Sequence, residues 1–331
     1  MATLGEASLL HGIGLRYFVE VARSGSLAAA SENMHVAISA ISRQIAKLEQ
    51  EVGTPLFERM ARGMVLTESG ELLAQHARRA LMDAEAVINE ISEAHALGKG
   101  IVRVGCTEGF SRYFLPSVLA TFYAEYPRTR FVLRSGTPAQ VENWVAIGEV
   151  DLGVAFSTAT STALNVEYSE NAPVCALLQV SHPLAKKDVL SLEDLLAYPV
   201  AVLERGTTVR QLIDWCCSLR GKHLEPLLTS NNSSAMHHFA ALTGTITLGS
   251  AISLRGMKRD ASWLAKRIDE PLLNERHLQV TAMKERRLPT PVQQFLAALK
   301  DAFREGLPGE PAIGAQVKQR RTGARTGRRN G

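Results

Sequence analysis

The chain has 331 residues, of which 46% are hydrophobic and 21% are charged. This length favours two or three domains, and this balance is typical of a globular protein and excludes a disordered or fibrous one. The tail after Glu310 contains six cations and no acid, which exceeds the net charge of +4. The rest of the chain is therefore slightly acidic, and any contact with nucleic acid depends on where its cations lie.

Three features of the chain favour the cytoplasm: no secretory signal, no apolar run long enough for a membrane helix, and cysteines expected to be reduced. The first thirty residues contain no basic stretch followed by an apolar one, as a secretory signal would. Pro226 to Leu254 lacks charge, but Ser, Thr, Asn and His interrupt it, so it does not supply the apolar run of a membrane helix. The cysteines have no metal-ligand spacing, so we expect buried reduced thiols, no metal and no cofactor, with a redox switch as the lesser alternative. They are Cys106, Cys175, Cys216 and Cys217.

Three helices are expected at the start of the chain. Apolar residues at 15, 18, 19 and 22 have helical spacing, and Gly25 ends this first helix. Ser26 can cap a second helix from Leu27 to about Met34, and a short turn near Asn33–Val36 leads into a third, from about Ala37 to Val52. Together the second and third helices predict a helix-turn-helix. The buried stripe of the third is expected at Ile41, Ile45, Leu48 and Val52.

A hairpin and a long helix are expected next. Arg59 to Leu66 centres on Arg62-Gly63, which favours a small two-stranded wing, and Thr67 can cap the helix that follows. This helix either packs on its own domain or forms a dimer seam; we favour the dimer, because the opposite face is polar and no other segment is expected to cover the apolar one. The apolar positions repeat every four and three residues. They are Leu73, Ala77, Ala80, Ala84, Val87, Ile91 and Ala94.

After a hinge at residues 97–100, strands and helices alternate. Strands are expected at 101–105, 129–133, 150–156, 174–178, 200–203 and 277–283, and near 227 and 246. Helices are expected up to Tyr126, from Pro138, from about Thr208 and over 291–303. This rhythm predicts two α/β halves with mostly parallel sheets around a cleft. The Gly-, Pro- and Arg-rich residues 306–331 are expected to be a disordered tail; it either adds non-specific phosphate affinity or keeps the end solvated, and we favour solvation.

From Leu15 to Gly70 the sequence resembles the DNA-binding region of the LysR-type transcriptional regulators. The resemblance is carried by LRYFVEVA, GSLAAA, ISRQIAKLE, GTPLFER and VLTESG, and continues loosely to about residue 300 through LPSVLATFYAEYP, DLGVAF and SHPLA. It implies a winged helix-turn-helix at 1–66, a dimerising linker helix at 67–98 and an effector domain of two α/β subdomains, of periplasmic-binding-protein type, at 99–305, before the basic tail at 306–331. It also implies a homotetramer at promoters, whereas the residues alone favour a homodimer.

The third helix is expected to enter the major groove of promoter DNA with its N-terminal residues toward the bases. The family usually has Ser or Thr followed by Gln where this chain has Ala37 and Ile38. Isoleucine can touch a thymine methyl but cannot hydrogen-bond a base, so the operator is expected to differ from the usual one. The expected contacts with double-stranded DNA are Ser26, Ala37, Ile38, Ser39, Ser42, Arg43 and Lys47, with Arg59 and Arg62 on the wing.

Ligands of α/β domains sit beyond strand ends, at helix N-termini, although such positions also serve as plain helix caps. The residues expected to contact a small-molecule effector are Thr107, Glu108, Gly109, Ser135, Gly136, Thr137, Phe156, Arg205, Gly206, Thr207 and Ser233, with Asn231–Ser234 as a further loop. The family's effectors are often carboxylates. Glu108 would repel an anion unless it pairs, as with Arg205, or turns outward, so zwitterionic and neutral ligands stay open.

Other classes of protein fit the sequence less well. No phosphate loop, nucleophile elbow or zinc-protease motif appears, and His237 and His238 would point apart on a helix, so an enzyme is not expected. A solute-binding protein would not need residues 15–66. A redox-sensing module with DNA binding and an effector-independent repressor remain as alternatives to a non-enzymatic regulator whose promoter binding is modulated by an effector.

Overall fold

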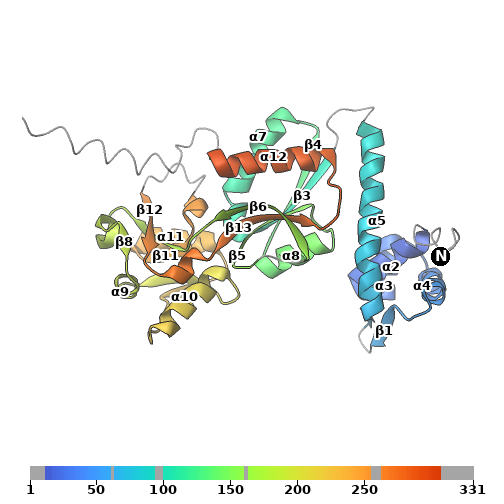
Figure 1. Ribbon diagram of the computed structural model, residues 1–331, viewed down its shortest axis with the longest axis horizontal. Coiled ribbons are helices and arrows are strands. Elements are labelled where there is room, and N and C mark those ends of the chain that lie inside the picture. Colours follow the sequence, from blue (N-terminus) through green and yellow to red (C-terminus); the bar gives the residue numbers. More distant parts are fainter. Residues whose placement is uncertain (1–11, 61–62, 94–99, 160–162, 255–261, 307–331) are drawn as a thin grey trace, which may run out of the picture. The chain divides into compact units, whose positions relative to one another are not determined.

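The computed structural model describes residues 12–60, 63–93, 100–159, 163–254 and 262–306. The chain forms two compact units, which divide mainly near Leu97. The first unit holds three helices, a hairpin and a long helix, and the second holds two sheets covered by helices (Figure 1). This confirms the expected fold class, whereas the bounds of the four expected segments stay a prediction.

Three short helices build the first unit: α2 (Ile13–Ser24), α3 (Leu27–Met34) and α4 (Ile38–Val52). Gly25 ends α2 in the left-handed conformation, with φ of 68° and its N–H donating to the Val21 carbonyl. The unit's core joins these helices to the hairpin and to the long helix. Its buried side chains include Leu15, Phe18, Val21, Ile41, Ile45, Leu48, Leu56 and Phe57. Val52 was wrongly expected in the buried stripe: it is the last residue of α4, and 43% of it is exposed.

The hairpin and the long helix follow as expected. Strands β1 (Phe57–Met60) and β2 (Gly63–Leu66) pair antiparallel, with Phe57 opposite Leu66. Helix α5 (Glu68–Glu93) begins after Thr67, whose hydroxyl accepts the N–H of Gly70 at 3.0 Å. Thr67 therefore caps α5 while its own hydroxyl donates to the Pro55 carbonyl.

The apolar heptad positions of α5 are buried near the start of the helix and exposed further along it. Ala77 is fully buried in the core of the first unit, and Leu73 packs against that core. The first heptad thus packs on its own domain, which corrects the expectation of one continuous dimer seam. Ala84 and Val87 are exposed, Val87 by 50%. The side chain of Ile91, and Ala94, lie outside the described residues.

The first sheet of the second unit has the order β4-β3-β5-β13-β6. Strands β3 (Gly100–Thr107), β4 (Thr129–Gly136) and β5 (Leu152–Ser157) are parallel, and β13 (His277–Met283) runs antiparallel to β5 and to β6 (Leu164–Asn171). Helices α7 (Phe114–Glu125) and α12 (Thr290–Glu305) cover one face and α8 (Pro138–Ala146) the other (Figure 1). The one-turn helix α6 (Glu108–Ser111) follows β3 directly.

The second sheet has the order β10-β9-β11-β7-β12-β8. Its strands are β7 (Cys175–Gln179), β8 (Val189–Leu190), β9 (Val200–Leu203), β10 (Leu228–Ser230), β11 (Ile246–Gly249) and β12 (Trp263–Ile268). Alternate side chains of β7 pack toward α9 (Leu192–Leu196) and α10 (Thr208–Leu219) or toward α11 (Ser233–Thr243) on the opposite face. Short turns of 3-10 helix complete this half at η2 (Pro183–Lys186), η3 (Ala251–Leu254) and η4 (Pro271–Asn274).

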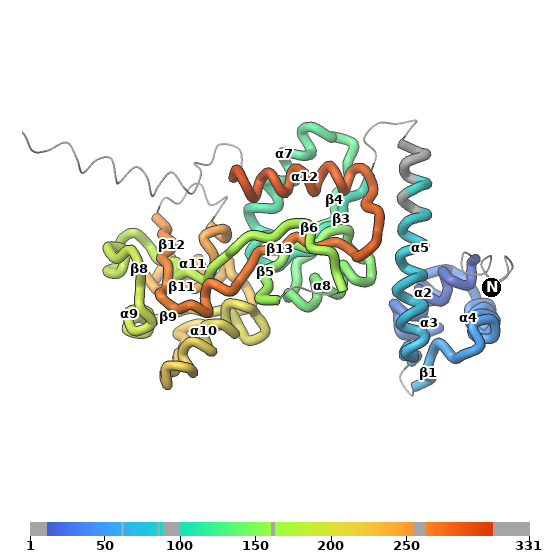
Figure 2. The backbone as a smooth tube through the Cα atoms, viewed as in Figure 1, coloured from blue at the N-terminus to red at the C-terminus, as the bar shows by residue number. Residues whose placement is uncertain are grey.

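Both sheets are mixed. Strands β3, β4 and β5 are parallel as expected, whereas β13 and β7 each run antiparallel to both of their neighbours. The chain crosses between the halves twice, once after β6 and once before β13. Beside these crossovers β6 pairs antiparallel with β13 and β7 pairs antiparallel with β12, while β12 is parallel to β8 on its other side. The segments at these crossovers run side by side (Figure 2), with His277 opposite Asn171. Among the described helices, none is long and apolar enough to cross a membrane.

Candidate functional site

Helix α4 presents a polar and cationic face opposite its buried stripe. Ile38, Ser39, Arg43 and Lys47 are exposed, and Ser42 is half-buried. Since Ile41, Ile45 and Leu48 hold the other side of α4 in the core, the exposed face is fixed in direction. Lys47 lies 3.8 Å from Glu51, a surface ion pair that contributes little to stability.

The turn before α4 is held by local hydrogen bonds. The Ser31 hydroxyl donates to the Val36 carbonyl at 2.6 Å, and His35 adopts the left-handed conformation with φ of 55°. Ala37 occupies the N-cap position and provides no side-chain bond, while 48% of Ile38 is exposed. As expected from Ala37 and Ile38, α4 lacks a side-chain cap, and its first turn exposes an apolar residue.

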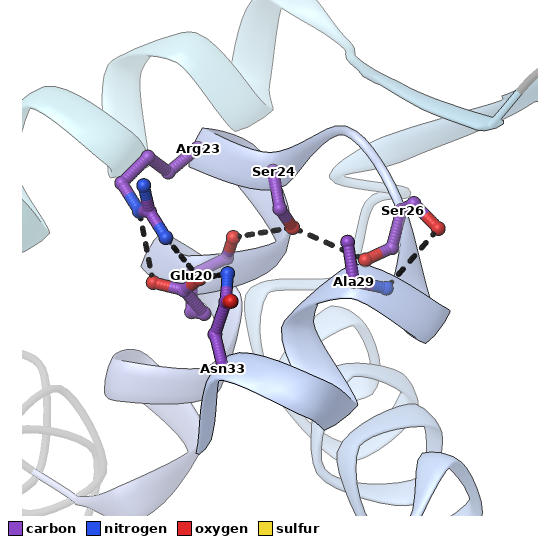
Figure 3. A network of polar contacts seen from close by, with 6 residues as sticks. All are labelled: Glu20, Arg23, Ser24, Ser26, Ala29 and Asn33. Carbon is purple, nitrogen blue, oxygen red and sulfur yellow. Dashed lines mark hydrogen bonds and ion pairs between the residues drawn. The ribbon is translucent and has the colours of Figure 1, made fainter. Parts of the chain in front are cut away.

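A polar network joins α2 to α3 (Figure 3). The Glu20 carboxylate accepts hydrogen bonds from Arg23 at 2.6 and 3.0 Å and from the Asn33 amide at 2.7 Å. Ser26 caps α3 by accepting the N–H groups of Ala28 and Ala29. Ser26, which we expected to contact DNA, thus has a structural role as the N-cap of α3.

The wing is anchored at both of its ends. Glu49 of α4 accepts the N–H groups of Leu56 and Phe57, at 2.8 and 3.3 Å. The N–H of Met64 donates to the Gly25 carbonyl at 2.8 Å, so the hairpin is tied to the end of α2. Arg59 is exposed on β1, and Arg62 lies outside the described residues.

The second unit contains a cavity of about 350 Å³ between its two halves. It lies at the carboxyl ends of two parallel strand pairs, β3 with β4 and β9 with β10. Thr107 pairs with Gly136 in one sheet, and Ser230 pairs with Leu203 in the other. We call this cavity the cleft. The predicted residues that line it are Thr107, Glu108, Gly109, Ser135, Gly136, Thr137, Phe156, Thr207 and Ser233.

Arg205 and Gly206, also predicted, are exposed and are not among the residues that line the cleft. From the same loop, the predicted Thr207 and the unpredicted Glu204 line the cleft. Thr207 caps α10 by accepting the N–H of Arg210. Thr207 thus lines the cleft, while Arg205 and Gly206 stay in solvent.

The carboxylate of Glu108 bridges the two halves of the second unit. Its Oε2 accepts the Ser233 N–H at 2.8 Å and the Ser233 hydroxyl, and its Oε1 accepts the Ser234 hydroxyl at 3.1 Å. Glu108 therefore occupies the N-terminus of α11, where backbone N–H groups favour an anion. The suggested pairing with Arg205 was wrong, since these two described residues form no ion pair.

Arg276 is the cationic side chain of the cleft that the sequence reasoning missed. It is 1% exposed, lines the cleft, and donates to the carbonyls of Ala172 and Pro173 at 2.9 and 3.5 Å. Its guanidinium lies over the Phe156 ring, 4.2 Å from the centroid. The only sequence signal was a basic residue directly before an apolar strand.

The other missed lining residues gave weaker signals. Gln140 lines the cleft and also has a capping role: its Oε1 accepts the Thr137 N–H at 2.9 Å and the Thr137 hydroxyl accepts the Gln140 N–H at 3.3 Å, so the two residues cap α8 reciprocally. Apolar side chains supply much of the wall. They include Leu203, Val209 and Leu248. His237 also lines the cleft, and burial lowers its pKa, so it is neutral near pH 7.

Comparison with known proteins identifies the family. Residues 14–71 match the bacterial regulatory helix-turn-helix of the lysR family, and residues 95–304 match the LysR substrate binding domain. The transcriptional dual regulator GltC of Bacillus subtilis is 31% identical over 72% of this chain and 78% of its own length. The chain belongs to the LysR-type transcriptional regulators.

Two further similarities agree with this assignment to the LysR-type regulators. The uncharacterized HTH-type transcriptional regulator YvbU of Bacillus subtilis is 26% identical over 87% of this chain and 97% of its own length. A full-length OxyR variant from Pseudomonas aeruginosa superposes with a TM-score of 0.63 at 20% identity, covering 90% of this chain and 98% of that one, which shows a shared fold. The regulator is a DNA-binding, non-enzymatic protein with an effector-binding domain.

The network at Glu20 makes stability of the DNA-binding unit depend on pH. The hydrogen bonds from Arg23, and then from Asn33, lower the pKa of Glu20 against the opposing effect of burial. A carboxylate with a lowered folded-state pKa stabilises the fold fully above its unfolded pKa of about 4.3, and this contribution is lost as pH falls through the folded value. Replacing Glu20 by glutamine is expected to destabilise the unit by about 1 kcal/mol at pH 7.

Unfolding of wild type and Glu20→Gln, followed by circular dichroism at pH 7 and at pH 3, would measure this difference. The gap should narrow as the pH falls from 7 to 3, because the Glu20 carboxylate becomes protonated. Glu32→Gln, a change at an exposed residue of α3, serves as the control and should leave stability at pH 7 unchanged. A gap for Glu20→Gln that persists unchanged at pH 3 would show that the carboxylate charge is irrelevant.

Proposed function

We propose that α4 of this regulator enters the major groove of promoter DNA with its first two turns toward the bases. The observation that supports this is the single exposed face that joins Ile38, Ser39 and Arg43, opposite side chains held in the core. Arg43 would pair with a guanine edge or a phosphate, and Ile38 would contact a thymine methyl. Ala37, Ser42 and Lys47, with Ser26 and the wing residues Arg59 and Arg62, would contact the backbone or flank the bases.

We further propose that a small-molecule effector binds in the cleft and alters the DNA contacts. The cleft joins two halves of one unit, so a ligand that contacts both halves favours one relative arrangement over others. Oligomerisation, as a homodimer or homotetramer, would use the exposed part of α5 near Val87 and place two reading helices on two half-sites. We place this action in the cytoplasm.

The direct test is selection of genomic DNA fragments with the purified protein, followed by footprinting of the enriched site. The expected result is a protected inverted repeat with half-sites about one helical turn apart and a thymine under the first turn of α4. Enrichment without sequence preference at moderate salt, with and without cell extract as an effector source, would contradict base reading by α4.

The redox-sensing alternative receives no support from the cysteines. All four are buried and free. Burial, and secondarily Glu108, raises the pKa of the Cys106 thiol to about 12, and burial together with Glu270 raises that of Cys216 to about 11. Burial also raises the pKa of Cys175 and Cys217. Because the thiolate is the reactive form, these thiols are poor targets for oxidants.

The expected result is that iodoacetamide at pH 8 labels the native regulator at least about a hundredfold more slowly than the protein unfolded in guanidinium, as followed by mass spectrometry. The unfolded protein is the internal control for reagent activity. One cysteine that labels rapidly in the native state would return redox sensing to consideration and would name its residue.

A further inference from the structure

Arg276 is a buried charge without an acidic partner. Within the described part of the chain, no carboxylate lies within ion-pair distance of its guanidinium. Two backbone carbonyls and the Phe156 ring face it, and these compensate only part of a full positive charge. A buried cation that also lines a cavity is therefore expected to receive an anion from that cavity.

The charge of Arg276 survives its burial. Burial lowers the pKa of the guanidinium to about 10, and the Cys175 thiol acts weakly in the opposite direction. The group thus stays protonated near pH 7, about three units below this value. Arg210 provides the contrast: it is also buried, but Asp214 accepts its Nε–H at 2.8 and 2.9 Å, and it does not line the cleft.

A second polar group of the cleft is incompletely satisfied. The Thr107 hydroxyl is buried and forms no hydrogen bond, although Thr107 lines the same cleft as Arg276. Buried hydroxyls are almost always bonded, so this one is expected to donate to a ligand. Apolar side chains also line the cleft, among them Phe156, Val209 and Leu248, and these suit a hydrocarbon body.

The acids of the cleft limit the charge of that ligand. Glu108 already fills the N-terminus of α11, so this helix end is not available to a second anionic group. Glu204 lies on the same lining. A dianion such as phosphate or a dicarboxylate would bring its second charge toward these carboxylates, whereas a monoanion would not.

We propose that the effector is a small monocarboxylate whose carboxylate pairs with Arg276 and whose hydrocarbon part packs on the apolar side chains that line the cleft. This inference rests on the proposed effector role of the cleft and adds the ligand's chemical class and its anchor. A planar carboxylate suits a guanidinium because both can form two parallel hydrogen bonds.

The position of Arg276 links this ion pair to the arrangement of the two halves. Its side chain binds the carbonyls of Ala172 and Pro173, and its own carbonyl accepts the Ala172 N–H at 2.8 Å. These residues belong to the two adjacent crossovers between the sheets (Figure 2). A carboxylate that pairs with the guanidinium therefore acts at the segments that connect the two halves, where hinges between domains commonly lie.

The test uses the full chain and calorimetric titration with sodium acetate, butyrate and benzoate at constant ionic strength. Benzamide is the neutral analogue of benzoate, and phthalate and inorganic phosphate are the dianionic probes. At least one monocarboxylate should bind with a dissociation constant in the millimolar range or below, at least tenfold more tightly than benzamide, phthalate or phosphate. Failure of all three monocarboxylates to bind, or equal binding of benzamide, would overturn the inference.

Substitutions locate the binding. Arg276→Gln should weaken monocarboxylate binding at least tenfold, and Thr107→Val severalfold, whereas the control Arg210→Gln should leave it unchanged. Should Arg276→Gln fail to fold, Arg276→Lys keeps the charge but loses the two-point geometry, and it should weaken binding measurably. Binding that survives both Arg276→Lys and Thr107→Val would overturn the assignment.

Footprinting separates this inference from the proposed effector role. A monocarboxylate that binds through Arg276 but leaves the DNA footprint unchanged would preserve the subsite and contradict the effector role of the cleft. A footprint that responds to the monocarboxylate equally in wild type and Arg276→Gln would preserve an effector response and contradict the subsite.

Discussion

Replacing Gly70 by alanine is expected to destabilise the DNA-binding unit by about 3 kcal/mol. A Cβ at this position would lie 2.1 Å from the Leu56 carbonyl oxygen and 3.0 Å from its carbon. These are backbone atoms, and the same carbonyl accepts the Thr67 N–H at 3.0 Å, so relief of the clash requires α5 to move away from the segment before the wing. That movement would also break the bond from the Gly70 N–H to the Thr67 hydroxyl.

Gly14→Ala is the matched control, because Gly14 is also helical. The three atoms nearest to its Cβ would all belong to Gln44, at ordinary contact distances of 3.5 Å or more, so the change is expected to stabilise α2 by up to about 1 kcal/mol. Since Trp144, Trp215 and Trp263 all lie in the other unit, amide hydrogen exchange of α2 and α4 is the suitable measurement. Equal protection in the two variants would contradict the close approach at Gly70.

Helix starts were predictable from the sequence because caps act locally. Ser26 and Thr207 each accept N–H groups within the next three residues, so α3 and α10 begin where their side chains predict. The wing followed from Gly63 between two short extended stretches. The loops that line the cleft followed from the rule that ligands lie beyond the carboxyl ends of parallel strands, which needs only strand order along the chain.

Features that depend on distant partners were not predictable. Strand β6 (Leu164–Asn171) carries mostly polar residues and is a strand because β13, more than a hundred residues later, pairs with it. The first heptad of α5 is periodic whether it meets a second copy or its own core, and only the fold shows that Ala77 meets the core. Arg276 has no motif at all: its burial and its place in the cleft arise where two crossovers meet.

Replacing Arg43 by alanine is expected to weaken binding to the selected operator by about 1–3 kcal/mol, or about 5- to 150-fold, if the guanidinium pairs with a base. Arg43 is exposed on α4, one turn after Ser39, and it forms no ion pair within the described chain. Its side chain is therefore available for DNA without loss of an internal contact, and its removal should not affect folding.

Two other variants of α4 show whether the loss of operator affinity in Arg43→Ala reflects contact with a base or with the backbone. Lys47→Ala removes a cation that would reach a phosphate, so it should weaken operator and random DNA equally and reduce the salt dependence by about one counterion. Gln50→Ala, also exposed, should change neither affinity. Fluorescence anisotropy with operator and scrambled duplexes at several salt concentrations measures all three. If Arg43→Ala weakens both duplexes equally, Arg43 binds the backbone, and base reading by α4 would then depend on Ile38 and the serines of its first turns.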